Sequence, residues 1–151
     1  MSDGANDFTL LAVWANNHND PDGQYIEQVW KAVKYYAELL SKEKVVVMGD
    51  FNSNKIWDKQ HRIANHSSVV NELVDYNIHS AYHLYFEQEQ GSEKNPTFFL
   101  QRNREKPYHI DYCFLSAPFH KKIKNVEIGI YEKWITFSDH MPVIVDTDTQ
   151  E

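Results

Sequence analysis

Residues 44–52, which read KVVVMGDFN, contain the strongest structural signal in the chain. The apolar, β-branched run that stops at Gly49 is typical of a short strand buried on both faces. Asp50 and Asn52 follow this strand and alternate around Phe51, whose ring would anchor the turn in the core. Glycine, aspartate and asparagine are also ordinary turn formers. The pattern predicts either a simple turn or polar groups held at a sheet edge to meet a phosphate, a metal ion or a water.

The segment before this stretch predicts a βαβ unit. Residues 8–14 form a nearly continuous apolar run and indicate a buried strand. A helix should follow, with Pro21 in its first turn, Asp20 or Asp22 as its cap, and apolar residues at three-to-four spacing as far as Leu40. The two strands should be parallel and joined by a right-handed crossover.

A second helix is expected after the central stretch. Ser67 or Ser68 would cap it, and it should end near Asn77. His79 and His83 come next at a spacing of four, which suits either a metal-ligand pair on a helix or simple packing. The polar segment that follows predicts a mobile loop over residues 87–95.

The last third of the chain indicates antiparallel strands. Its short aromatic or β-branched segments are separated by turns and occupy residues 97–100, 109–115, 126–131 and 142–145. Alternation within the second of these segments buries Ile110, Tyr112 and Phe114 on one face and places Asp111 on the opposite face, where a carboxylate needs a partner. The overall pattern predicts an α/β (α+β) fold with a mixed sheet.

Length and composition favour one soluble domain over residues 1–151. The net charge of −7 argues against binding of nucleic acid through a broad basic surface. Cys113 is the only cysteine and lies in an apolar run, which predicts an inert core thiol. The first seven residues lack the basic and apolar regions of a signal peptide, and no apolar run reaches the ~20 residues that span a bilayer. We therefore expect a cytoplasmic chain that does not enter a membrane.

A Ser138-Asp139-His140 triplet lies just before the last predicted strand. An adjacent aspartate and histidine can serve as metal ligand and proton-transfer group if another carboxylate orients the imidazole. Asp111 is the natural candidate for that orienting group. A triplet of this kind is also common in surface loops.

Three motifs together resemble the C-terminal motifs of the endonuclease/exonuclease/phosphatase superfamily. In chain order they are residues 49–52 (GDFN), 109–112 (HIDY) and 138–142 (SDHMP). Each falls in the matching context, which is a strand end, a strand interior and the loop before the last strand. Residues 96–98 (PTF) resemble a weaker motif of the same family. The resemblance extends over about residues 8–146.

The resemblance implies a Mg²⁺- or Mn²⁺-dependent phosphoesterase. Asp50 would orient or deprotonate the attacking water and supply a metal ligand, Asn52 would bind the scissile phosphate, and Asp139 would ligate the metal. His140, held by Asp111, would stabilise the transition state or assist the leaving group. The physical logic agrees, because phosphate esters require charge neutralisation, an aligned nucleophile and a stabilised leaving oxygen.

Members of this family begin with a further half that carries an Asn and a Glu of the main metal site, and neither motif is present here. The resemblance therefore implies a half or truncated form of a four-layer αββα sandwich. One expectation is a phosphodiesterase that acts on DNA or RNA. The alternative is a catalytically inactive half-domain that serves as a binding or oligomerisation module.

An uncovered sheet face is expected in a half-sandwich, and a homodimer would cover it. The apolar strand residues available for that face are Val45, Val47, Ile110, Tyr112, Val126, Ile128, Val143 and Val145. The alternative is that loops and the long helix close the core within one chain.

Several aromatic and basic residues near the motifs allow two interpretations each. Trp57 and Trp134 would either stack a base or pack under the site. Trp14 or its neighbours stand where many members of the family carry a His or Tyr that contacts phosphate. The predicted hairpin loop at 102–107 carries Arg102, Arg104 and Lys106, which would meet a phosphodiester backbone or only solubilise a turn.

Overall fold

The computed structural model describes residues 7–16, 19 and 23–148. The strands are β1 (Thr9–Trp14), β2 (Val45–Asp50), β3 (Ile78–Ser80), β4 (Phe98–Phe99), β5 (Pro107–Tyr108), β6 (Asp111–Ser116), β7 (Ile123–Ile128) and β8 (Val143–Thr147). The helices are α1 (Ile26–Tyr35), α2 (Ala37–Leu40), α3 (His66–Asp75), α4 (Ala81–Phe86), α5 (Ala117–His120) and α6 (Tyr131–Trp134), with short 3₁₀ turns η1 (Lys55–Trp57) and η2 (Leu100–Arg102).

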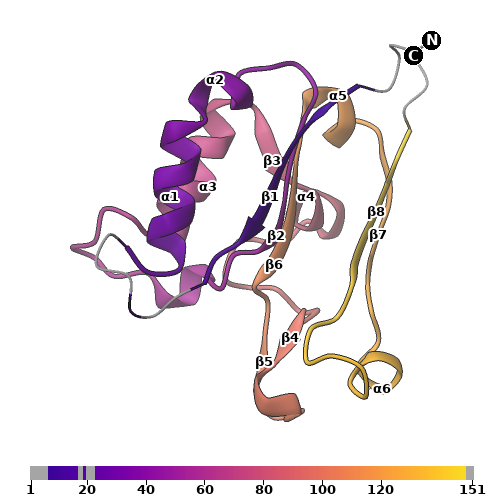
Figure 1. The fold of residues 1–151 in the computed structure, drawn as a ribbon. Helices are drawn as coiled ribbons and strands as arrows, with labels where there is room; N and C mark the ends of the chain where they lie inside the picture. The colour runs from indigo at the N-terminus through magenta and orange to yellow at the C-terminus, as the bar shows by residue number, and fades with distance from the viewer. Residues whose placement is uncertain (1–6, 17–18, 20–22, 149–151) are drawn as a thin grey trace.

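A four-stranded mixed sheet with the order β1-β2-β6-β3 forms the centre of the molecule (Figure 1). β1 and β2 are parallel and are connected through α1 and α2, which confirms the predicted βαβ unit. The prediction that the first strand is buried is wrong, because alternate residues of β1 are exposed. β6 runs antiparallel to both β2 and β3. The predicted α/β class with a mixed sheet and antiparallel C-terminal strands is therefore confirmed.

One face of the sheet packs against α1 and α3. Val45, Val47 and Phe114 are fully buried there against Val33 and Leu73 of the two helices. Complete burial of one such side chain stabilises the fold by about 1.5–3 kcal/mol, so this layer contributes several kcal/mol to the stability. The long helix predicted as far as Leu40 is interrupted at Tyr36, which separates α1 from α2. The predicted Pro21 turn and the Asp20 or Asp22 cap lie outside the described residues.

The opposite face of the sheet is only partly covered. The β7–β8 hairpin and α4 bury Cys113 and Leu115 of β6 together with Ala81 and Val126. Toward β1 and β2 this face stays open, because residues 10 and 48 there are exposed. The sequence left open which alternate set of strand residues faces the uncovered side. The structure shows that residues 45, 47 and 112 point toward the helices, so the other set forms the open face.

The segment that leads into α3 differs from expectation. α3 begins at His66. The backbone N–H groups of His66 and Ser67 donate to the Asp58 carboxylate at 2.8 and 3.1 Å. Ser68 accepts from the backbone N–H of Asn65 instead of serving as the first cap residue. α3 therefore begins slightly earlier in the sequence than predicted.

Two further expectations are corrected. His79 lies in β3 and His83 in α4, so they do not form a ligand pair on one helix. The final strands are also shifted, because β7 begins at Ile123 and Tyr131 already belongs to α6. Among the described residues no helix has the length and apolar character needed to span a membrane.

Candidate active site

Two aspartates lie side by side where β2 meets β6. Asp50 ends β2 and pairs in antiparallel register with Asp111, the first residue of β6. Directly opposite side chains project from the same face with Cβ atoms about 4.5–5.5 Å apart. Like charges at this separation repel each other, so the pair requires a cation, a proton or strong hydrogen-bond donors.

Gly49 allows β1 to lie close to β2 next to the two aspartates. Its φ is 137°, and a Cβ at this position would lie 1.9 Å from the carbonyl oxygen of Val13. No other residue type fits without separating the strands. The glycine of the motif is therefore required by strand packing next to Asp50.

The Asp50 carboxylate is held by the turn that follows it. The Asn52 backbone N–H donates to Oδ1 at 2.8 Å, and the Asn52 Nδ2 amide donates to Oδ2 at 2.8 Å. Asn52 Nδ2 also donates to the carbonyl oxygen of Ala15 at 2.8 Å, while its backbone adopts a left-handed φ of 45°. Burial raises the pKa of Asp50, the backbone N–H of Asn52 opposes this, and the Asp111 charge raises the pKa further.

His140 reaches this pair from the loop before β8. Its Nδ1 lies 3.1 and 3.0 Å from the two carboxylate oxygens of Asp111, so Nδ1 carries the donated proton and Nε2 is left for other partners. The hydrogen bond that His140 donates to Asp111 raises the pKa of His140, although burial opposes it. The Phe98 ring lies 4.7 Å from the imidazole and fixes its other side.

Thr97 fastens the two halves of this arrangement together. Its buried hydroxyl oxygen accepts from the backbone N–H groups of Ile110 and Asp111, both at 3.0 Å. Its carbonyl oxygen accepts from the N–H of Met141 at 2.7 Å. Thr97 thus binds both Met141, which follows His140, and Asp111, which carries the carboxylate that His140 contacts. This gives the PTF segment at residues 96–98 a physical role that the sequence did not reveal.

Asp50, Asp111 and His140 form a group that can hold a metal ion. Each offers one ligand atom, and these atoms lie within 4.8 Å of one another. Two neighbouring carboxylates, one of them with a raised pKa, are a donor set that a divalent cation would fit. Asp139 is not part of this group among the described residues; its backbone oxygen accepts from the N–H of Phe99 at 2.9 Å. Its assignment as a metal ligand stays a prediction.

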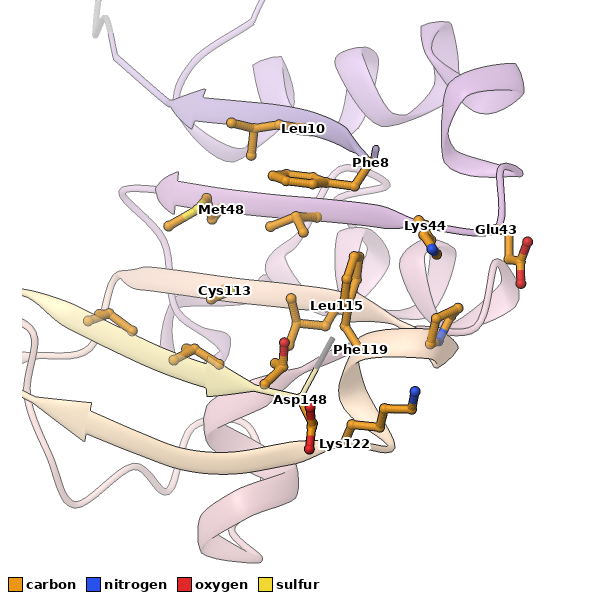
Figure 2. A pocket seen from close by; sticks show the side chains of 15 residues that line it. Phe8, Leu10, Glu43, Lys44, Met48, Cys113, Leu115, Phe119, Lys122 and Asp148 are labelled. Atoms are coloured by element: carbon orange, nitrogen blue, oxygen red, sulfur yellow. The ribbon is translucent and has the colours of Figure 1, made fainter. Parts of the chain in front are cut away.

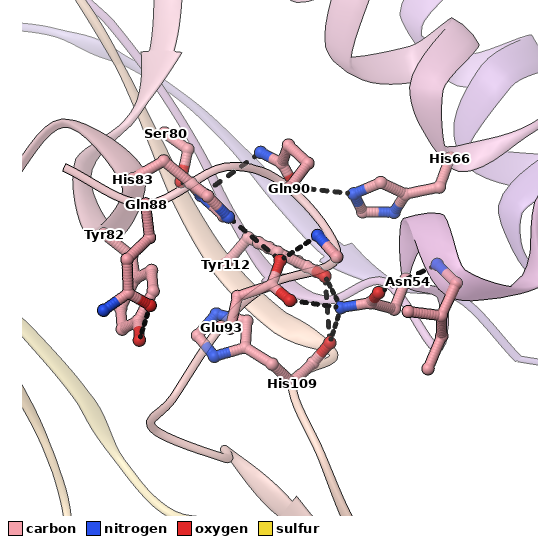
Figure 3. A network of polar contacts seen from close by, with 12 residues as sticks. Asn54, His66, Ser80, Tyr82, His83, Gln88, Gln90, Glu93, His109 and Tyr112 are labelled. Atoms are coloured by element: carbon pink, nitrogen blue, oxygen red, sulfur yellow. Dashed lines mark hydrogen bonds and ion pairs between the residues drawn. The ribbon is translucent and has the colours of Figure 1, made fainter. Parts of the chain in front are cut away.

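A buried polar network centres on Glu93, in the segment predicted as a mobile loop (Figure 3). The side chain is only 4% exposed. Its Oε1 accepts from His83 Nε2 and from the Gly91 N–H, both at 2.9 Å, and its Oε2 accepts from Asn54 Nδ2 at 3.1 Å. Burial alone would raise the pKa of Glu93, but these donors outweigh it and lower the pKa to about 2. The loop is anchored to the core through this carboxylate.

The same network connects the loops on either side of the aspartates. Asn54 Nδ2 donates to the carbonyl oxygen of His109 at 2.9 Å. The Tyr112 hydroxyl donates to the carbonyl oxygens of Ser53 and His109 at 3.2 and 2.9 Å. Because these residues directly flank residues 50–52 and 111, the network fixes their backbone positions. Nothing in the local sequence around Glu93 distinguishes it from a surface glutamate.

The remaining candidates mostly make structural contacts. Trp57 packs against Tyr108, with ring centroids 5.2 Å apart, and stays partly exposed. Trp134 lies beside Gly129, where an added Cβ would approach its ring to 2.8 Å. Of the basic hairpin, Arg104 forms an ion pair with Glu132 on α6. Its guanidinium is therefore oriented by protein contacts.

Comparison with known proteins identifies the fold. The 3′ phosphatase NExo from Neisseria, solved with a product DNA hairpin, superposes with a TM-score of 0.68 and 17% identity. An AP endonuclease from Archaeoglobus fulgidus gives 0.63 and 13%. These alignments cover 92% of this chain and 60% and 61% of those chains, respectively. No family model matches the sequence, and no curated protein matches it.

The structure and these neighbours define the class of fold. The chain has the fold of endonuclease/exonuclease/phosphatase proteins and spans about 60% of the length of the neighbours. The resemblance predicted from the three motifs is thereby confirmed at the level of the fold.

Proposed function

We propose that this chain carries the phosphate-binding and proton-transfer half of a metal-dependent phosphodiesterase, with nucleic acid as its leading substrate. The observation that carries the proposal is the convergence of Asp50, Asp111 and His140 at one corner of the sheet. A structural role alone does not explain two adjacent carboxylates, because their mutual repulsion costs stability.

The chain's own residues divide the chemistry between them. Asp50, with its raised pKa, orients the attacking water and accepts its proton. Asp111 fixes the His140 tautomer so that Nε2 faces the phosphoryl group or the leaving oxygen. Asn52 is assigned to the phosphate, although its two amide hydrogens already meet Asp50 and Ala15, so it must re-orient to donate.

A Mg²⁺ or Mn²⁺ ion would be held by Asp50, with Asp139 as the further ligand inferred from the motif, and would supply charge neutralisation and polarisation of the phosphoryl oxygen. Such an ion fits the carboxylate oxygens that Asp50 and its neighbour Asp111 offer at this corner, whereas Asp139 lies outside that group and is assigned from the motif alone. We expect weak affinity, because few protein carboxylates reach this position. A cytoplasmic location also stays part of the proposal.

Nucleic acid is favoured by the neighbours, since one was solved with DNA and another is an AP endonuclease. The test is a cleavage assay with a plasmid, an abasic-site duplex and a generic diester, each in the presence of Mg²⁺ or Mn²⁺. Asp50→Asn and His140→Ala should each lower cleavage by about 100-fold or more. Glu89→Gln, an exposed change in the Glu93 loop, is the control and should retain activity. Absence of metal-dependent cleavage of all three substrates by a version that also carries the further half of the sandwich would remove the enzyme proposal.

A second candidate function is self-association through the open sheet face. Figure 2 shows an apolar groove between the sheet and β8, with Phe8, Leu10 and Met48 on one side and Cys113 and Leu115 between them and β8. Phe8 and Leu10 are each about half exposed. Contiguous apolar surface of this kind on a soluble protein marks an interaction site.

We propose a second copy of the chain as the occupant of the groove. Its end carries charges of both signs, from Glu43, Lys44, Lys122 and Asp148, so a two-fold contact can place unlike charges together. Sedimentation equilibrium at micromolar concentration should show a dimer, and Leu10→Glu should give a folded monomer. A wild-type chain that stays monomeric and does not aggregate would exclude the dimer.

A further inference from the structure

An exposed tryptophan stands in line with the two aspartates. Trp14 ends β1 in register with Asp50, which in turn lies opposite Asp111. Neighbouring strands are about 4.8 Å apart, and residues in register project from the same face. The three side chains therefore form a row across three strands, with the indole at the edge of the sheet.

The indole of Trp14 does not take part in the core. The side chain is 75% exposed, and Ala12, its neighbour on the same face of β1, is small and exposed. Among residues 7–16, 19 and 23–148, no aromatic ring or cation packs against it, whereas Trp30 and Trp57 have such partners. Trp14 also does not line the apolar groove. One face of the ring is thus open beside the candidate active site.

The backbone that presents this ring is held by the site itself. Ala15 is buried, its N–H donates to the Asp50 carbonyl oxygen at 2.8 Å, and its own carbonyl oxygen accepts from Asn52 Nδ2 at 2.8 Å. A ligand that stacks on Trp14 would therefore immobilise little additional backbone. An exposed aromatic ring on a fixed strand is suited to binding a flat partner.

The net charge of the chain favours an unpaired nucleobase as this flat partner. With a net charge of −7, the chain cannot gain most of its affinity for nucleic acid by neutralising many phosphates. Stacking of bases on aromatic side chains is the other main source of affinity, and it requires bases that are not paired. A duplex keeps its bases stacked inside and offers none to Trp14.

We propose that Trp14 is a stacking platform for an unpaired nucleobase whose neighbouring phosphate lies at Asp50, Asp111 and His140, so that the site takes single-stranded or frayed nucleic acid in preference to intact duplex. This inference rests on the proposed function, because the phosphate position is taken from it. Recognition by stacking also gives binding that depends only weakly on salt.

The test is fluorescence anisotropy with three labelled probes of equal length: oligothymidylate, a base-free abasic oligomer, and a duplex. Wild type should bind oligothymidylate tightest. Trp14→Ala should weaken that binding by about tenfold, whereas Trp14→Phe should retain most of it. Tyr35→Ala removes an equally exposed ring, 81% accessible on α1, and should change nothing. Circular dichroism confirms that each variant is folded.

The outcomes separate the two proposals. Equal binding of the base-free oligomer and oligothymidylate, preference for duplex, no binding, or unchanged binding by Trp14→Ala would each overturn the stacking inference. The inference would also be overturned if Trp14→Ala lost self-association but still bound oligothymidylate, because the indole would then belong to a dimer face. Base-dependent binding that requires Trp14, without metal-dependent cleavage, would support the platform while removing the phosphodiesterase proposal.

Discussion

Replacement of Glu93 by glutamine tests the network that holds the candidate site. The substitution keeps the size and one acceptor oxygen but removes the charge. In the native protein that charge accepts hydrogen bonds from His83, Gly91 and Asn54. We expect Glu93→Gln to lower the free energy of unfolding at neutral pH, because the buried donors then meet a weaker acceptor.

The magnitude follows from the pKa of this side chain. The pKa falls from 4.5 to about 2 on folding, and one pKa unit corresponds to about 1.4 kcal/mol. The ionised carboxylate therefore contributes about 3 kcal/mol. Because the folded-state pKa is lowered, this contribution is present in full above pH 4.5 and is lost as the pH falls toward 2.

The assay is urea unfolding of wild type and Glu93→Gln at several pH values. The difference between them should be about 3 kcal/mol at neutral pH and should shrink toward zero below pH ~3. Glu89→Gln, an exposed change in the same loop, should stay within about 0.5 kcal/mol of wild type throughout. A Glu93→Gln difference below about 1 kcal/mol at neutral pH, or one that does not vary with pH, would refute the proposed role of the buried charge.

The remaining predictions concern three other positions. Gly49→Ala should destabilise the chain by about 3 kcal/mol or more, because the new Cβ would collide with the Val13 carbonyl; unchanged thermal unfolding would contradict this. Asp111→Asn should lower the pKa of His140, since the carboxylate raises it, and an unshifted NMR titration of the imidazole would disprove the coupling. Burial raises the pKa of Cys113 to about 11, so a thiol reagent should label it slowly in the native protein and quickly in denaturant; fast native labelling would show that the strand opens.

The neutral state of two buried histidines adds to the acid sensitivity of the network. Burial lowers the pKa of His66 and of His109, and each has one ring nitrogen without a hydrogen-bond partner. A histidine with a lowered pKa stabilises the fold above its ordinary value of 6.5 and loses that contribution as the pH falls below it. Because the Glu93 charge itself raises the pKa of both histidines, Glu93→Gln also changes their contribution, and the effect of the Glu93 charge is read from how the difference changes between pH 4.5 and 2.

The sequence by itself predicted the parts that depend on short-range patterns. The buried strand before Gly49, the polar turn after it and the strand that carries Asp111 follow from hydrophobic alternation and turn chemistry, which act within a few residues. The resemblance of three motifs in order also indicated the fold that the structural neighbours share. The core thiol expected at Cys113 is confirmed by its burial.

Only the tertiary structure decided which strand faces and loops meet. The alternation within β2 is compatible with either face pointing outward, and the packing of α1 and α3 chose the face of Val45 and Val47, leaving Met48 on the open side. Glu93 has the local sequence of a solvated loop. In the fold it is a buried anion, because Asn54 and His83, which lie in other parts of the sequence, donate hydrogen bonds to its carboxylate. Trp14 likewise acquires its place beside Asp50 through strand pairing. Pairing between distant segments depends on the whole packed core, and a local pattern of residue types does not contain that information.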